Sequence, residues 1–223
     1  MSEVGNPVPR IAVLASGNGS NLQAILDRVA AATLRVTPAL VISDVHDARA
    51  LRRASTAGVA TKVIAPGDYV SKDAWNEAIA IELLAAGVSL VVLAGFMRII
   101  GAQVLAEFSG RILNIHPSLL PRYPGLNTYK KVLAAGDSWH GTSVHFVTEE
   151  LDGGPVIAQA MLPVDAQDDE STLRQRVLTA EHWLYPLVIS WFADGRLEMR
   201  AAQAWLDGKA LPEPVRFAET GPT

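Results

Sequence analysis

Short apolar segments alternate with segments of helical pattern through the first half of the chain, and this alternation constrains the fold more than any other feature. The apolar segments cover residues 11–15, 39–43, 61–64, 90–94 and 112–116. Strands that alternate with helices pair in parallel, because each crossover helix returns the chain to the starting edge of the sheet. We therefore predict an α/β fold with a mainly parallel, open, twisted sheet and helices on both faces.

The expected helices have recognisable ends. We predict helices over residues 21–32, 48–57, 72–86 and 171–194. Ser20 and Gln23 have the spacing of a capping box at the start of the first helix, and Ser71 is the expected cap of the third. Pro186 is expected to kink or end the last helix, since proline cannot donate to the helical ladder.

The pattern changes after residue 140. Residues 142–147 and 156–164 are apolar and separated by a short loop, which predicts antiparallel strands toward the C-terminal half, and Asp207-Gly208 predicts a small hairpin. With 49% hydrophobic and 19% charged residues, the chain has the composition of a globular domain. We predict one domain over residues 1–223, with loose tails at 1–9 and 213–223.

The charge and hydropathy of the chain disfavour several kinds of partner. The formal net charge is −4, from 19 basic and 23 acidic side chains, and no continuous basic stripe is present, so we expect no nucleic-acid partner. The apolar stretch 88–100 is interrupted by Gly95 and Arg98 and is too short to cross a bilayer. Met1–Arg10 lacks the order of a signal peptide, so we expect a cytoplasmic protein without a membrane partner.

A glycine-rich turn, Ser16 to Leu22, lies between an expected strand and an expected helix. Gly17 and Gly19 permit a tight backbone turn, and the free N–H groups of the helix start attract an anion the size of one phosphate monoester. A tight structural turn with a serine cap is the plainer alternative. A dinucleotide site is a weaker one, since Asp44 could meet a ribose but Leu22 stands where the third glycine belongs.

Asn114 and His116 lie at the end of the strand predicted over 112–116. Side chains two apart on a strand point to the same face, so these two project together, and Pro117 ends the ladder. An amide donor beside an imidazole could stabilise a developing oxyanion and transfer a proton. Their position at a strand end of an open α/β sheet favours a functional site over a structural histidine.

The acidic loop 149–155 is a third candidate. A carboxylate in this loop could lie beside His116 and favour its protonated form, or it could simply begin a turn before two glycines. Composition leaves the choice open among Glu149, Glu150 and Asp152.

The remaining histidines are assigned no chemistry. His145 is expected to be structural, as are His46 and His182, and His140 receives no role. No cluster of histidines and carboxylates has metal-ligand spacing, so we expect no catalytic metal. The chain has no cysteine and no nucleophile elbow. These features point to direct attack by one substrate on another.

Five blocks in order carry a resemblance to a known family. From about Arg10 to Leu211 the chain resembles the phosphoribosylglycinamide formyltransferases, the folate-dependent enzymes of purine synthesis. The blocks are SGNGSNLQAI from Ser16, LAGFMRI from Leu93, LNIHPSLLPRYPG from Leu113, GTSVHFVTEELDGGPVI from Gly141 and LVISWFADGRL from Leu187. The resemblance implies a Rossmann-like formyltransferase fold and formyl transfer from 10-formyltetrahydrofolate to the amine of phosphoribosylglycinamide.

The resemblance also implies roles for individual residues. It makes Asp152 the catalytic carboxylate, with His116 and Asn114 as its partners. The residues implied to bind the ribonucleotide are Gly19, Ser20, Asn21 and Glu181. Those implied to bind the folate are Lys72, Met97, Arg98, Ile99, Ile100 and Asn114. Lys72 stands where the family often has arginine, so it keeps the charge but loses a bidentate grip on the folate tail.

Two relatives with the same Asn-His-Pro-Ser-Leu-Leu-Pro core are alternatives. Methionyl-tRNA formyltransferase normally has a further C-terminal domain and a basic surface, whereas formyltetrahydrofolate deformylase has an N-terminal regulatory domain and passes the formyl group to water. The length of 223 residues favours the small phosphorylated amine as acceptor. A catalytically silent folate- or nucleotide-binding module is the third alternative, and the sequence does not predict an oligomeric state.

Overall fold

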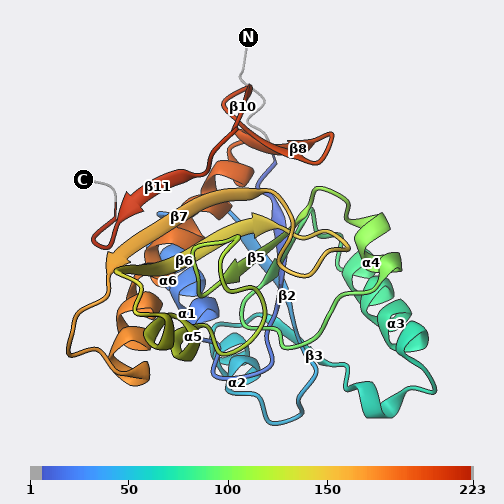
Figure 1. The fold of residues 1–223 in the computed structure, drawn as a ribbon. Helices are drawn as coiled ribbons and strands as arrows, with labels where there is room; N and C mark the ends of the chain where they lie inside the picture. Colours follow the sequence, from blue (N-terminus) through green and yellow to red (C-terminus); the bar gives the residue numbers. More distant parts are fainter. Residues whose placement is uncertain (1–6, 222–223) are drawn as a thin grey trace.

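An eight-stranded sheet in the order β11-β7-β6-β5-β4-β1-β2-β3 forms the centre of the computed structural model, which describes residues 7–221 (Figure 1). Five neighbouring strands pair in parallel with one another, namely β1 (Arg10–Leu14), β2 (Thr37–Ser43), β3 (Ala60–Val63), β4 (Leu90–Leu93) and β5 (Ile112–His116). The edge strand β11 (Val215–Ala218) also has a parallel neighbour. Two antiparallel strands follow, β6 (Trp139–Phe146) and β7 (Val156–Pro163). The predicted mainly parallel sheet with later antiparallel strands is confirmed.

The strand order places a switch point at the centre of the sheet. The chain runs outward from β1 through β2 to β3, and then starts again at β4 on the other side of β1. The connections on the two sides of this point diverge, which leaves a crevice beyond the carboxyl ends of β1 and β4. Ligands of open α/β sheets bind at this place.

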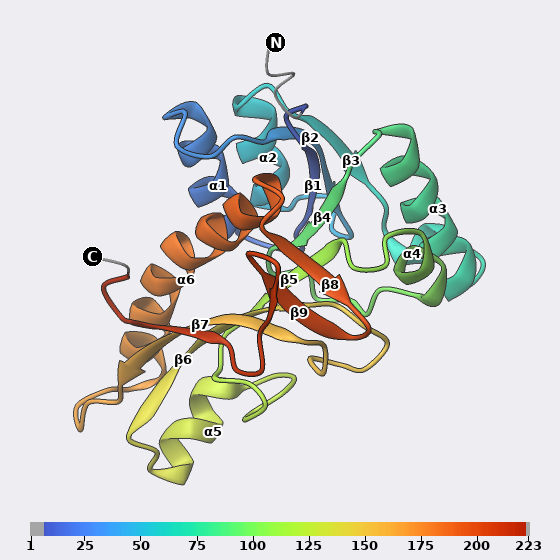
Figure 2. The ribbon, with the colours of Figure 1, turned by 90° about the horizontal axis from the view of Figure 1, so that it is seen from above.

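Helices cover both faces of the sheet (Figure 2). One layer consists of α1 (Ser20–Ala30), α2 (Arg49–Thr56) and α6 (Glu170–Ala193), and the other of α3 (Lys72–Ala85) and α4 (Ala102–Glu107). Alternate residues of β1 separate the two cores: Ile11 and Val13 pack toward the first layer, and Ala12 and Leu14 toward the second. Helix α5 (Thr128–Ala135) packs against α6, and a short 3-10 turn, η1 (Pro66–Asp68), precedes α3.

The helix ends agree with the sequence at α3 and differ at α1. Ser71 Oγ accepts a hydrogen bond from Ala74 N at 3.1 Å, which confirms the predicted cap. The capping box at Ser20 and Gln23 is wrong, because Gly19 is the N-cap residue and Ser20 already lies inside the helix. A glycine at the cap leaves the first turn of α1 without a side-chain acceptor.

Pro186 lies within α6 and does not end it. The helix is 24 residues long in all and continues beyond Pro186 to Ala193, and the nearby Tyr185 and Val188 are buried. Packing along the sheet therefore compensates for the missing donor of the proline. After α6 the strands β8 (Leu197–Arg200), β9 (Gln203–Leu206) and β10 (Lys209–Ala210) form a small antiparallel sheet. The predicted turn at Asp207-Gly208 joins β9 to β10.

The expected loose tail at 213–223 is wrong for residues 215–219. Strand β11 (Val215–Ala218) pairs in parallel with β7 at the edge of the main sheet. Beyond it, the Glu219 carboxylate accepts two hydrogen bonds from Arg176 of α6, each 3.0 Å long. Residues 222–223, and 1–6 of the expected N-terminal tail, lie outside the described residues. Among the helices of 7–221, none combines the length and apolar character that a bilayer crossing requires.

Candidate active site

Three segments that contain predicted site residues meet at the carboxyl edge of the parallel sheet. The glycine turn follows β1, residues 94–101 follow β4, and Asn114 and His116 lie at the end of β5, and these three strands are neighbours. Ser16 N donates to Gly95 O at 3.0 Å and ties the first two segments together. The candidate site therefore coincides with the switch point of the fold.

Gly19 sets the path of the glycine turn. Its φ of 71° lies in the left-handed region, and a Cβ at this position would stand 2.8 Å from the Cα and Cβ of Ala50 on α2. Only glycine satisfies both conditions without strain. Because no side chain caps the helix, the first N–H groups of α1 remain available to an anion.

Asn21 and Glu181 form a buried pair although they are 160 residues apart. Asn21 Nδ2 donates to Glu181 Oε2 at 2.7 Å. Burial raises the pKa of Glu181 to about 7, because the carboxylate loses its hydration. Asn21 Oδ1 is also buried and has no hydrogen-bond partner within residues 7–221. The pair joins α6 to the glycine turn, and it leaves Asn21 Oδ1 as a hydrogen-bond acceptor that a ligand at this turn could use.

Ser20 borders a cavity of about 390 Å³ between α1, α2 and α6. The lining residues are Ser20, Gln23, Ala24, Asp27, Arg28, Arg53 and His182. The Arg53 guanidinium is fixed by Asn18 O at 2.8 Å and Gln23 Oε1 at 2.9 Å. Cationic side chains beside a helix start suit a phosphate group.

His116 and Asp152 face each other, with Asn114 and His145 alongside. His116 Nδ1 lies 3.5 Å from Asp152 Oδ2, and His145 Nε2 lies 3.8 Å from Asp152 Oδ1. Asn114 Nδ2 lies 3.1 Å from His145 Nε2. Of the three carboxylates left open by the sequence, Asp152 is therefore the one beside His116.

His145 belongs to this cluster, which the sequence did not predict. Its Nδ1 donates to Phe146 O at 2.8 Å, since a carbonyl oxygen can only accept. In neutral His145, Nε2 is then an acceptor for the Asn114 amide. Burial lowers the pKa of His145, which favours this neutral form. His145 thus fixes which end of the Asn114 side chain is the donor.

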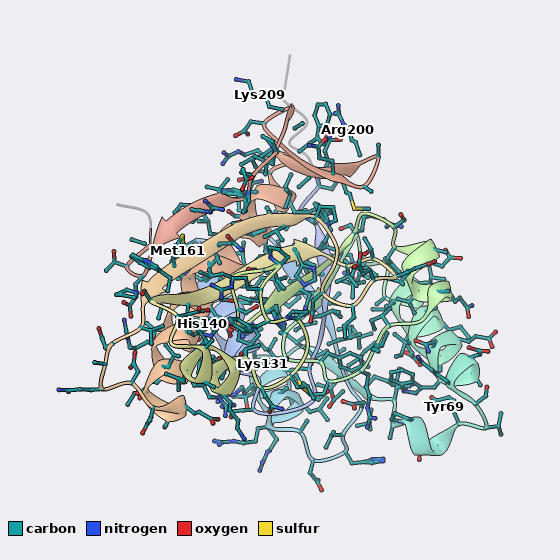
Figure 3. All side chains as sticks on the ribbon, in the orientation of Figure 1. Tyr69, Lys131, His140, Met161, Arg200 and Lys209 are labelled. Atoms are coloured by element: carbon teal, nitrogen blue, oxygen red, sulfur yellow. The ribbon has the colours of Figure 1, made fainter. Side chains whose placement is uncertain are left out.

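His116 is held by the loop that follows β5. Its Nε2 donates to Tyr123 O at 3.0 Å, so both ring nitrogens face oxygen acceptors. The loop is anchored to β6, where Ser143 Oγ donates to Ser118 O at 2.6 Å, and it contains the cis peptide bond Leu120-Pro121. Further along, Lys131 Nζ donates to Pro124 O at 3.2 Å (Figure 3).

Asp152 connects its own loop, residues 149–155, to the loop that follows β5. Its Oδ2 also accepts a hydrogen bond from Gly125 N at 2.8 Å. Its backbone has a φ of 51°, a strained value for a residue with a side chain. Leu126 and Leu151, which neighbour these two residues in sequence, are both exposed. The carboxylate is therefore placed by loop conformation rather than by a regular element.

The segment after β4 presents apolar side chains to solvent. Met97 and Ile99 are 64% and 56% exposed. Ser16 Oγ accepts a hydrogen bond from Met97 N at 2.8 Å, and Asn76 Oδ1 accepts one from Gly101 N at 2.7 Å. Exposed apolar side chains on a backbone anchored in this way suit a flat apolar ligand.

The other residues expected to bind folate are spread around this segment. Asn76 Nδ2 donates to Lys72 O at 2.8 Å, so the exposed Lys72 begins α3 beside the segment. Arg98 Nε donates to Asp44 Oδ2 at 2.7 Å. Ile100 differs from its neighbours, because its side chain is buried in the core against the α3 layer. Within residues 7–221, no three His, Cys, Asp or Glu side chains are arranged so that they could hold a metal ion.

The chain belongs to the formyl transferase family, whose model matches residues 9–189. Among its relatives in that family, phosphoribosylglycinamide formyltransferase of Escherichia coli (strain K12) is 53% identical over 91% of this chain and 95% of the relative. The enzyme of the same name from Haemophilus influenzae is 45% identical over 92% and 96%. The structure of the Coxiella burnetii phosphoribosylglycinamide formyltransferase superimposes with a TM-score of 0.91 at 44% identity, over 95% of this chain and all of that one.

Proposed function

We propose that the protein transfers the formyl group of 10-formyltetrahydrofolate to the amine of phosphoribosylglycinamide, giving formylglycinamide ribonucleotide and tetrahydrofolate in purine biosynthesis. The observation that carries this proposal is the cluster of Asn114, His116 and Asp152, which lies at the same carboxyl edge of the sheet as the glycine turn and the exposed apolar segment after β4. The 53% identity to the Escherichia coli enzyme over almost its full length supports the same substrates.

The ribonucleotide occupies the side of the crevice nearest α1 and α6. Its phosphate accepts hydrogen bonds from the first turn of α1, with Gly19, Ser20 and Asn21 closest to it. Its ribose hydroxyls donate to the buried acceptors of Glu181 and Asn21. This placement brings the glycinamide amine toward the end of β5.

The folate occupies the opposite side. Its flat ring packs on Met97 and Ile99, and its carboxylate tail reaches the cationic groups of Arg98 and Lys72. The formyl carbon then lies next to Asn114. Holding both substrates in contact converts a bimolecular encounter into an oriented reaction.

Attack of the neutral amine on the formyl carbon forms a tetrahedral oxyanion. Asn114 Nδ2 carries two hydrogens, and His145 accepts only one of them, so the second is free to donate to the oxyanion. Protonated His116 is the second donor, once its Nε2 exchanges the Tyr123 carbonyl for the oxyanion. No enzyme nucleophile takes part.

Asp152 has two tasks in this scheme. Its carboxylate lies 3.5 Å from His116 Nδ1 and pairs with that ring when the ring carries the transferred proton. It also accepts the proton that the amine loses, directly or through a water molecule. The bond between the formyl carbon and N10 of the folate then breaks. N10, the bridging amine nitrogen, takes up the proton that His116 or Asp152 holds, and tetrahydrofolate leaves.

An absorbance assay for tetrahydrofolate formation tests the proposal. Product that forms only with phosphoribosylglycinamide present identifies a transferase. Equal product without it would identify a hydrolase, and folate binding without any product would identify a silent binding module. Each of these two results would contradict the proposal.

A further inference from the structure

Asp44 is a buried charge that the proposed reaction does not use. It follows β2, and its side chain is only 2% exposed. Its Oδ2 accepts the hydrogen bond from Arg98 Nε, whereas Oδ1 is buried and has no partner within residues 7–221. A buried carboxylate with one unpaired oxygen lowers stability. Stabilisation of the fold therefore does not explain why an aspartate occupies position 44.

The Arg98 side chain is fixed at its inner end and open at its outer end. Asp44 contacts only Nε, and the side chain is 51% exposed. The two terminal nitrogens carry four further N–H donors, and none of them has a hydrogen-bond partner in the described part of the chain. A guanidinium in this state is preorganised to bind a carboxylate through two parallel hydrogen bonds.

The backbone around Arg98 is also held in place. Met97 N is bound to Ser16 Oγ and Gly101 N to Asn76 Oδ1, so both sides of the segment are anchored. Met97 and Ile99 flank Arg98 in the sequence, and both side chains are exposed. An apolar wall beside an oriented cation matches a ligand that combines a flat apolar body with a carboxylate.

We propose that Asp44 is a positioning residue that orients Arg98 to bind a carboxylate of the folate tail. This inference rests on the proposed function, which supplies the folate. It also replaces the weaker hypothesis that Asp44 meets a ribose, because its Oδ2 is occupied by Arg98 and its Oδ1 is buried.

The test compares Asp44→Ala, Asp44→Asn and the control Asp47→Ala, an exposed aspartate three residues away in the same loop. Asp44→Ala is expected to raise the KM for 10-formyltetrahydrofolate by roughly tenfold, with kcat and the KM for the ribonucleotide unchanged. Asp44→Asn keeps an acceptor for Arg98 Nε and is expected to restore part of the loss. Asp47→Ala is expected to behave like the unmodified protein.

A co-substrate analogue without the glutamate tail separates positioning from a general structural role. The Asp44→Ala effect is expected to vanish with this analogue, and also in the Arg98→Met background. An equal rise in KM for both co-substrates would overturn the inference, as would a fall in KM, which would mean that Asp44 competes with folate for Arg98. If Asp44→Ala does not fold, Asp44→Asn carries the test, because a rise in KM that does not depend on the tail gives the same refutation.

Calorimetric titration with the two folates keeps this inference distinct from the proposed function. It measures the tail-dependent affinity whether or not formyl transfer occurs. Absence of transfer by the unmodified protein would contradict the proposed function. Equal affinity of Asp44→Ala and the unmodified protein for the tailed folate would contradict the role of Asp44.

Discussion

Replacing Glu181 by glutamine is expected to stabilise the protein at alkaline pH while it weakens ribonucleotide binding. Burial raises the pKa of this carboxyl from 4.5 to about 7. At about 1.4 kcal/mol for each pH unit between 4.5 and about 7, burying the charged form of Glu181 costs about 3 kcal/mol of folding free energy. Glutamine has nearly the same size and can still accept the hydrogen bond from Asn21, but it has no charge to bury.

The sign of the pH dependence follows from the direction of the shift. A carboxyl with a raised folded pKa favours the folded state below the unfolded value of 4.5, and this contribution is lost as the pH rises through about 7. Glu181→Gln and the unmodified protein should therefore have similar free energies of unfolding near pH 4.5. At pH 8 the variant should be more stable by up to about 3 kcal/mol.

Urea unfolding at both pH values measures this difference, with Glu77→Gln on the exposed side of α3 as the matched control. The ribonucleotide KM of Glu181→Gln should rise by roughly tenfold to a hundredfold, since hydrogen bonds to a charged acceptor are lost. A stability difference that is equal at the two pH values would refute the burial argument. An unchanged KM would refute the contact between Glu181 and the ribose.

Three further predictions concern the site. Asn114→Ala should lower kcat by roughly a hundredfold to a thousandfold, the usual loss for one oxyanion donor, and near-normal turnover in a folded variant would count against its role. Combined Ser20→Ala and Asn21→Ala should raise the ribonucleotide KM without changing folate binding by calorimetry, whereas equal weakening of both ligands would mean the phosphate is misplaced. Gly19→Ala should lower the free energy of unfolding by about 1–3 kcal/mol, because a Cβ at 2.8 Å from Ala50 and a left-handed backbone are both unfavourable; unchanged urea unfolding would disprove this.

The local features of this chain could be predicted from the sequence because they depend on residues close together along it. The strand over 112–116 matches β5, and its period of two places Asn114 and His116 on one face. Ser71 caps α3 as expected, since the cap and its donor are three residues apart. The alternation of strands and helices was likewise sufficient to predict a mainly parallel sheet.

The wrong predictions concern contacts between distant segments. The capping box at Ser20 fits the local pattern, yet the close approach of Ala50 makes Gly19 the cap residue. Strand β11 lies in a C-terminal segment rich in proline, glycine and polar residues, and this segment is held by the pairing of β11 with β7 and by the contact of Glu219 with Arg176. Neither partner is visible in the local sequence.

By itself, the sequence determined the fold class, the glycine turn and the shared face of Asn114 and His116, because these follow from periodicity and from residues within a few positions of one another. Composition left three carboxylates open and the family resemblance implied Asp152, but only the tertiary structure places its carboxylate 3.5 Å from His116. Only the tertiary structure shows that His145 orients Asn114 and that Asp44 holds Arg98. Each of these contacts depends on sheet register or loop conformation. Sheet register and loop conformation are set by the packing of the whole chain, so they cannot be deduced from the sequence of one segment.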